Sequence, residues 1–157
     1  MRRSLSLLLP VLLAWLEPLP AESAQLRRFA LVVGANQGAP DRVRLRYAVQ
    51  DAERFARLIT QMGGVADADC LTLRDPGRQP LLDALDLVRE RSLAAREDGR
   101  RTEVLFYFSG HADESGLMLG RERLGYRELR RALTAMPTDV GIAVLDACAS
   151  GAITRLK

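Results

Sequence analysis

The fold of this chain can be worked out from the stretch Gly141–Gly151, GIAVLDACASG. It opens with the short apolar run Ile142–Leu145, which predicts a buried β-strand. Asp146, Ala147 and Cys148 follow directly, so the cysteine lies just past the end of that strand. In open α/β sheets, ligands bind at the edge where the strands end. We therefore expect Cys148 to lie at a ligand-binding edge of a sheet.

A second stretch has the same organisation. The apolar run Val104–Phe108, VLFYF, predicts another strand and is followed by Ser109, Gly110 and His111, the only histidine of the sequence. Parallel neighbouring strands would bring His111 and Cys148 to the same edge of the sheet. A thiolate and an imidazole held close together form a nucleophile with a general acid–base partner. Together the two stretches predict a Cys–His dyad, although a lone residue of either kind is more often structural.

The two motifs, YFSGHAD and LDACASG, resemble the catalytic motifs of caspase-like cysteine peptidases, the group of caspases and metacaspases. The resemblance extends over Arg28–Arg155. It implies an α/β fold, a three-layer αβα sandwich around a mainly parallel sheet. It also implies a cysteine-type endopeptidase that hydrolyses peptide bonds, with His111 and Cys148 as its catalytic residues.

The sequence departs from the family pattern at three places. Ala112 follows the histidine, where the family usually has glycine, and Asp146 stands two residues before the cysteine, as in metacaspases. The chain ends at Lys157, where the family continues with further strands. We therefore expect the C-terminal strands to be missing, Ile142–Leu145 to form an exposed apolar edge, and a partner to cover that edge. The alternative to an active peptidase is a non-catalytic interaction module or an inactive truncated fragment.

The resemblance implies a role for each residue of the site. Cys148 would attack the peptide bond, and His111 would exchange protons with the thiol and the leaving amine. The backbone N–H groups of Ala112 and Cys148 would bind the oxyanion. Asp146 precedes the cysteine by two residues, on the same side of an extended strand, and would bind arginine or lysine on the acyl side of the cleaved bond. The alternative for Asp146 is a cap on local backbone groups.

The first 24 residues predict a secretory signal peptide. A basic start is followed by the apolar run Leu5–Leu16, and Ala21–Ser23 offers small residues for cleavage. The alternative is an uncleaved anchor, and only then would the protein contact a membrane. We expect an exported protein, periplasmic or secreted. Residues 25–157 would form the N-terminal part of one caspase-like catalytic domain.

Composition limits the partners and cofactors. Lys and Arg number 23 against 20 Asp and Glu, without a basic cluster, and aromatic residues make up only 5%. These features argue against a nucleic-acid partner. Asp113 and Glu114 beside His111 are too few for a zinc site, and we expect both to be solvated. We predict no metal or cofactor, with no sequence support for the calcium stimulation found in metacaspases, and a protein or peptide as substrate.

Other patterns predict the remaining elements. The run Phe29–Val33 predicts a central strand, and the Gly/Pro/Asn loop after it is a candidate lining of the site. Helical spacing covers Arg44–Met62, and the alternation of strands and helices predicts a parallel sheet. Arg96–Arg101 is interpreted as a solvated helix end, and Cys70 as a packing residue rather than a disulfide partner. The buried stripe of the first helix is predicted to contain Ala48, Ala52, Phe55, Ile59 and Met62.

Overall fold

The computed structural model describes residues 25–148, so the predicted signal peptide lies outside the described residues. The strands are β1 (Leu26–Ala35), β2 (Cys70–Arg74), β3 (Arg101–Gly110), β4 (Gly116–Leu119), β5 (Glu122–Gly125) and β6 (Val140–Asp146). The α-helices are α1 (Ala48–Gln61), α2 (Arg78–Glu97) and α3 (Tyr126–Thr134), and a short 3-10 turn, Asp67–Asp69, precedes β2. Strands therefore alternate with helices as the sequence predicts.

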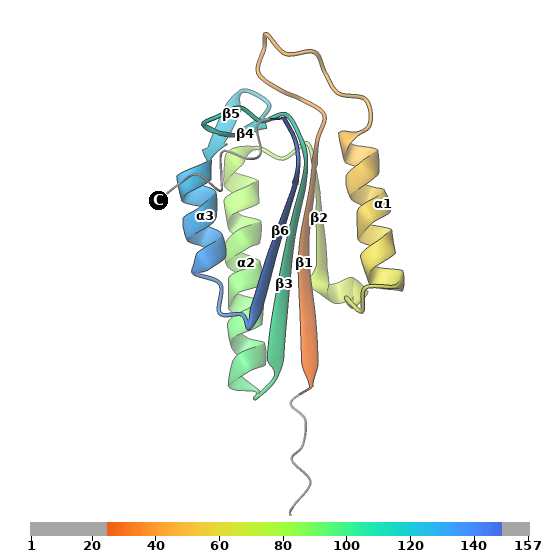
Figure 1. Ribbon diagram of the computed structural model, residues 1–157, viewed down its shortest axis with the longest axis vertical. Helices are drawn as coiled ribbons and strands as arrows, with labels where there is room; N and C mark the ends of the chain where they lie inside the picture. The colour runs from red at the N-terminus through yellow and green to blue at the C-terminus, as the bar shows by residue number, and fades with distance from the viewer. Residues whose placement is uncertain (1–24, 149–157) are drawn as a thin grey trace, which may run out of the picture.

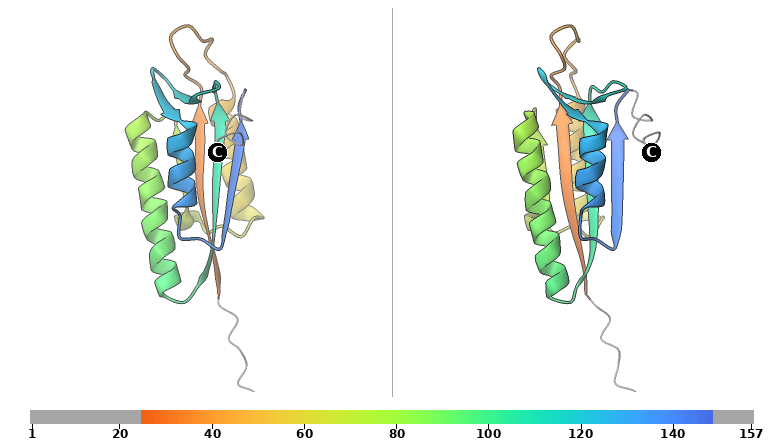
Figure 2. Two further views of the ribbon diagram at one scale, coloured as in Figure 1. Left: turned by 60° about the vertical axis from the view of Figure 1, so that its left-hand side comes forward. Right: turned by 90° about the vertical axis from the view of Figure 1, so that its left-hand side faces the viewer.

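The central sheet has the spatial order β2-β1-β3-β6, and every pair in it is parallel. Helix α1 covers one face of this sheet, while α2 and α3 cover the other, which makes three layers (Figure 1). A separate antiparallel hairpin, β4-β5, lies at the end of the molecule to which the sheet strands point (Figure 2). The predicted three-layer α/β fold is confirmed. No helix among residues 25–148 is long and apolar enough to span a membrane.

Two apolar layers hold the helices to the sheet. In β1, Phe29 and Leu31 pack toward α2 and α3, whereas Ala30 and Val32 pack toward α1. Strand β3 continues both layers, with Phe106 in the α2 layer. Because both faces of these strands are buried, their sequences are continuous apolar runs rather than alternating ones.

Helix α1 is shorter than predicted. It runs over Ala48–Gln61, whereas the predicted helix covered Arg44–Met62. Before α1, the Leu45 N–H donates to the Asn36 carbonyl at 2.8 Å, which ties this segment to the loop after β1. Met62 was expected in the buried stripe, but it is the C-cap residue and is 81% exposed. The prediction for Met62 is wrong because the helix ends before the apolar stripe reaches it.

Strand β6 is the edge strand of the described sheet. Among residues 25–148 it pairs only with β3, and Ile142 and Val144 are 50% and 39% exposed. The run Ile142–Leu145 is therefore not a buried strand but the exposed apolar edge that was also expected, because α1 packs over β1 and β3 and leaves β6 uncovered. The other face of β6 borders a groove of about 330 Å³ beside α3, lined in part by Leu133 and Met136. A partner that covers this edge stays a prediction.

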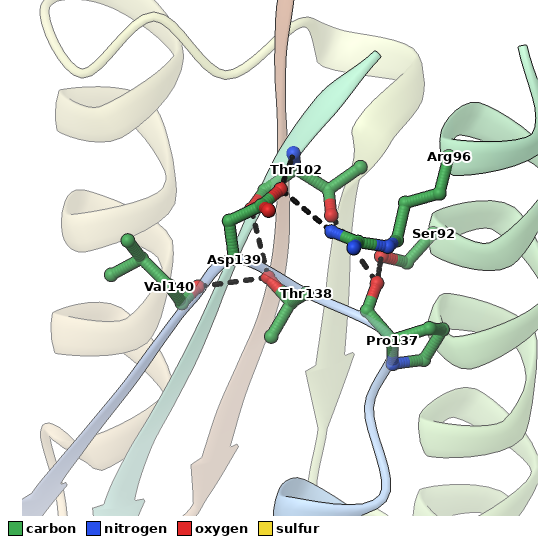
Figure 3. Close-up of polar contacts among 7 residues, drawn as sticks. All are labelled: Ser92, Arg96, Thr102, Pro137, Thr138, Asp139 and Val140. Atoms are coloured by element: carbon green, nitrogen blue, oxygen red, sulfur yellow. Dashed lines mark hydrogen bonds and ion pairs between the residues drawn. The ribbon is translucent and has the colours of Figure 1, made fainter. Parts of the chain in front are cut away.

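Polar side chains tie the amino end of β6 to α2 and β3 (Figure 3). The Asp139 carboxylate accepts a hydrogen bond from the Thr102 N–H at 2.7 Å and an ion pair from Arg96 at 2.7 Å. The Ser92 hydroxyl donates to the Pro137 carbonyl at 2.7 Å. Arg96 lies in the exposed last turn of α2, as the sequence predicts, but its guanidinium is ion-paired with Asp139 rather than only solvated. We call this set the amino-end cluster: Ser92, Arg96, Thr102, Pro137, Thr138 and Asp139.

Candidate active site

The pairing of β3 with β6 brings the two sequence motifs to one edge of the sheet. In this ladder Ser109 is paired with Asp146. His111 and Cys148 each come two residues after this pair, past the carboxyl ends of the neighbouring strands β3 and β6. Both strands end on the same side of the sheet (Figure 1). Parallel pairing therefore brings the ends of two segments that are distant in sequence to one edge of the sheet.

The imidazole of His111 is held by the loop of residues 36–47. Its Nε2 lies 2.8 Å from the carbonyl oxygen of Val43. A carbonyl oxygen can only accept a hydrogen bond, so Nε2 is the nitrogen that carries the proton and donates. In the neutral ring the lone pair is then on Nδ1. A single backbone contact therefore sets the tautomer of His111.

A glycine allows the loop to lie against the ring. A Cβ atom at Gly38 would lie only 2.6 Å from Cδ2 of His111, closer than side-chain atoms approach one another. The loop is itself anchored by Asp75, whose Oδ1 accepts the N–H groups of Asn36 at 2.6 Å and Gln37 at 3.1 Å. Any larger residue at Gly38 would therefore move either the ring or an anchored loop.

The sequence indicated this loop but not the residues in it that matter. The Gly/Pro/Asn composition after the first strand marked it as a candidate lining of the site. The contact between Val43 and His111 spans 68 positions and uses a backbone atom, so side-chain chemistry gives no sign of it. The one available signal was Gly38, a residue type that permits close approach.

Cys148 and Cys70 are both free thiols in different surroundings. Cys148 is exposed, and no hydrogen bond joins its thiol to another residue of the described range. Cys70 is half-buried in β2, and this burial raises the pKa of its thiol. Because β1 and β3 separate the strands of the two cysteines, they lie at least about 14 Å apart, too far for a disulfide.

Tyr107 lies near the carboxyl end of β3, and its hydroxyl is next to the carboxylate of Asp146. Its ring stacks on Phe55 of α1 with 4.2 Å between the ring centroids, and its hydroxyl lies 3.5 Å from Oδ2 of Asp146. Burial raises the pKa of Tyr107, and the negative charges of Asp146 and Asp51 raise it further. The carboxylate of Asp146, at the end of β6, therefore contacts this hydroxyl, while Asp51 on α1 acts on it through its charge. The sequence pointed to Asp146 but missed Asp51, which lies on a helix far away in the chain.

Ala112 stands where the family usually has glycine, and its backbone conformation is one that residues with side chains adopt readily. It forms an antiparallel bridge with Leu117, and hydrogen bonds on either side join residues 111 and 118 at 2.9 Å and residues 113 and 116 at 3.1 Å. In a pair of this kind the Ala112 N–H points away from β4. Among the described residues only Asp75 combines a side chain with a positive φ, so Ala112 is unstrained. Its methyl group is buried.

Asp113 stabilises the turn after Ala112. Its Oδ1 accepts the N–H groups of Ser115 at 2.8 Å and Gly116 at 3.1 Å, and Arg123 forms an ion pair with its other oxygen. The expectation that Asp113 is solvated is therefore wrong, whereas Glu114 is exposed. Within residues 25–148, no three His, Cys, Asp or Glu side chains are grouped so that they could hold a metal ion.

These observations define an α/β protein with a histidine and a cysteine past the carboxyl ends of neighbouring parallel strands. The family model described as "Caspase domain" matches residues 27–157. Since this match covers most of the chain, the protein belongs to the caspase-domain family, a family of cysteine peptidases. Comparison with curated proteins gave no match. The resemblance seen in the two motifs is thereby confirmed, and the peptidase domain implies protein substrates.

Proposed function

We propose that this protein is a cysteine-type endopeptidase that cleaves after arginine or lysine, with Cys148 as the nucleophile and His111 as the general acid–base. The observation that carries this proposal is the matched position of the two residues, two places beyond the paired Ser109 and Asp146. Membership in the caspase-domain family supports the same chemistry.

The contact between Val43 and His111 supports the proton transfers. With Nε2–H bonded to the carbonyl, Nδ1 is the nitrogen that takes the proton from the Cys148 thiol and passes it to the leaving amine. The thiolate attacks the peptide carbonyl, and the N–H groups of Ala112 and Cys148 bind the oxyanion that forms. Water then hydrolyses the thioester. Because the dyad supplies both nucleophile and acid, we propose that no metal or cofactor is needed.

Two carboxylates support the preference for a basic substrate residue. Asp146 comes two residues before the predicted nucleophile and its Oδ2 lies 3.5 Å from the Tyr107 hydroxyl, and the negative charges of both Asp146 and Asp51 raise the pKa of that hydroxyl. A guanidinium group has several donors in one plane and can bind two carboxylates at once. We therefore expect arginine to be preferred to lysine, and both to be preferred to neutral or acidic residues.

The test uses the full-length protein and a set of peptides that differ only at the residue before the cleaved bond. Hydrolysis after arginine by the natural chain, together with none by Cys148→Ala, is the expected result. Preference for aspartate would contradict the role of Asp146. An interaction module would bind peptides without cleaving them, and chelation of divalent cations should leave the rate of a true dyad enzyme unchanged.

We also propose that the protein is exported after removal of residues 1–24. The leader has the basic start, apolar centre and small residues that signal peptidases require. Mass spectrometry of the protein from its native cells should find an N-terminus near Ala24 or Gln25. A retained Met1 on membrane-bound protein would support the anchor instead.

A further inference from the structure

We infer that the loop of residues 36–47 is a cleavage site for a second copy of this enzyme, and that this cut inactivates the molecule that is cut. The bonds concerned are Arg42–Val43 and Arg44–Leu45. The inference rests on the proposed cleavage after arginine, and it assigns that activity a target within the chain itself.

The loop presents the residue type that the site is proposed to select. Arg42, Arg44 and Arg46 alternate along it and are all exposed. No ion pair joins any of the three to another residue between 25 and 148, whereas arginines such as Arg28 and Arg96 are paired with carboxylates. Val43, between two of these arginines, is 84% exposed. Their guanidinium groups are therefore free to enter an acidic pocket of another molecule.

The backbone of this segment also suits a substrate. Residues 43–45 belong to no helix or strand, and exposed loop tips are the preferred sites of proteolytic cutting. Arg57 and Arg131 are exposed as well, and no ion pair joins either of them to another residue between 25 and 148, but they lie in α1 and α3, where the backbone is held in helical hydrogen bonds. These two helical arginines provide a matched comparison, because residue type and exposure are the same and the backbone differs.

A cut on either side of Val43 would release the contact that sets the tautomer of His111. The Val43 carbonyl is held in place from both directions along the chain. Upstream, Asp75 binds the backbone at Asn36; downstream, the Leu45 N–H donates to the Asn36 carbonyl. Cleavage at Arg42–Val43 removes the first connection and cleavage at Arg44–Leu45 the second. The imidazole then loses its fixed partner and the enzyme loses activity.

The cut must come from a second molecule, because the Val43 carbonyl is hydrogen-bonded to His111 of its own chain. At the second bond, Cys148 of that molecule forms a thioester with the Arg44 carbonyl carbon as the bond to the Leu45 nitrogen breaks. The new amine of Leu45 receives the proton. One water then hydrolyses the thioester to the Arg44 carboxylate and restores the thiol, with no oxidation or reduction.

The experiment uses full-length Cys148→Ala protein as the substrate and the active full-length protein as the enzyme. Mass spectrometry should find new N-termini at Val43 and Leu45. Active enzyme alone should lose its peptidase activity at a rate that rises with protein concentration. The double variant Arg42→Gln/Arg44→Gln should retain activity at least several times longer, whereas Arg57→Gln/Arg131→Gln should decay like the natural chain.

Two results separate this inference from the proposed function. If an arginine peptide is hydrolysed while the loop stays intact, the inference is overturned and the proposed function stands. If no peptide is hydrolysed, both fail. A third measurement does not depend on the enzyme's own activity: brief treatment with trypsin, which cuts after arginine, should cut first at Arg42 or Arg44 within residues 25–148. A first cut elsewhere in that range would also overturn the inference.

Discussion

The two ends of strand β6 differ in how they are held. At its start, the amino-end cluster binds the chain to α2 and β3 through hydroxyl, carboxylate and guanidinium groups (Figure 3). Past its carboxyl end, Cys148 is exposed and has no hydrogen bond to another described residue, and the imidazole of His111, past the end of the neighbouring strand β3, has one, to the Val43 carbonyl. One end is a closed set of polar contacts, and the other is open to a ligand.

The difference shows how an edge strand can position a reactive residue. The amino-end cluster and the ladder with β3 set the register of β6, and register alone places Cys148 level with His111. At the carboxyl end Asp146 contacts the Tyr107 hydroxyl, but Cys148 beyond it is exposed, so a substrate backbone can approach the thiol. Substitutions at the two ends should therefore have different effects. Those at the carboxyl end should alter catalysis, and those at the amino end should alter stability.

The largest effect is expected from removing either member of the dyad. Cys148→Ala and His111→Ala should each lower the rate of peptide hydrolysis by about 10³-fold or more, because the nucleophile or its proton acceptor is lost. Both side chains lie outside the apolar layers, so thermal unfolding should change little. Cys70→Ser, away from the site, should retain activity. A His111→Ala variant with the natural rate would contradict the dyad.

Asp146→Asn should lower kcat/KM for arginine peptides by about 10- to 150-fold, the equivalent of about 1.5–3 kcal/mol for a hydrogen bond to a charged group. If peptides with a neutral residue at the same position are cleaved, their kcat/KM should fall less. The ratio of the two kcat/KM values is the measurement. An equal loss for both substrates would mean that Asp146 only supports the local backbone.

Gly38→Ala should lower kcat by about tenfold, because its methyl group would displace the His111 ring or the loop that holds it. Gly125→Ala is the matched control, since a Cβ there meets no atom closer than 3.8 Å. Steady-state kinetics of both variants, with circular dichroism to check folding, makes the comparison. Equal activity of the two variants would show that the approach of the loop to the ring does not matter.

Asp139→Asn should lower stability at neutral pH and leave the kcat of the folded protein unchanged. The Thr102 N–H and the Arg96 guanidinium lower the pKa of Asp139 in the folded protein. The unfolded chain therefore takes up the proton first as pH falls, and the stabilisation present above about pH 4 is lost below it. Thermal melts between pH 7 and pH 3 should show a smaller acid-dependent loss for the variant. Identical slopes would contradict this role of Asp139.

The sequence predicted well what local patterns determine. The runs FALVV and VLFYF appear as β1 and β3 because strands covered on both faces must be apolar throughout. The positions of His111 and Cys148 after two such strands were enough to place them at one edge, since parallel strands end on the same side. The apolar stripe of α1 was also correct, up to the point where the helix ends before Met62.

Contacts between distant backbone and polar groups could not be predicted in this way. Arg96 looked like one of several solvated charges, and its partner Asp139 is more than forty positions away. The Val43 carbonyl that holds His111 has no side-chain signature, since every residue except the terminus offers the same group. The charge of Asp51 acts on Tyr107 together with that of Asp146 only because α1 packs across the sheet. Each depends on tertiary packing rather than on a local pattern.

The reaction of Cys148 with a peptide electrophile that carries arginine tests the dyad most directly. The full-length protein and its His111→Ala variant are treated with the same reagent, and mass spectrometry follows labelling of Cys148 against labelling of Cys70 in the same molecule. We predict that Cys148 is labelled first in the natural chain and that His111→Ala slows this step by about a hundredfold or more while Cys70 is unaffected. Equal labelling rates for Cys148 in the two proteins would contradict the proposal that His111 activates it.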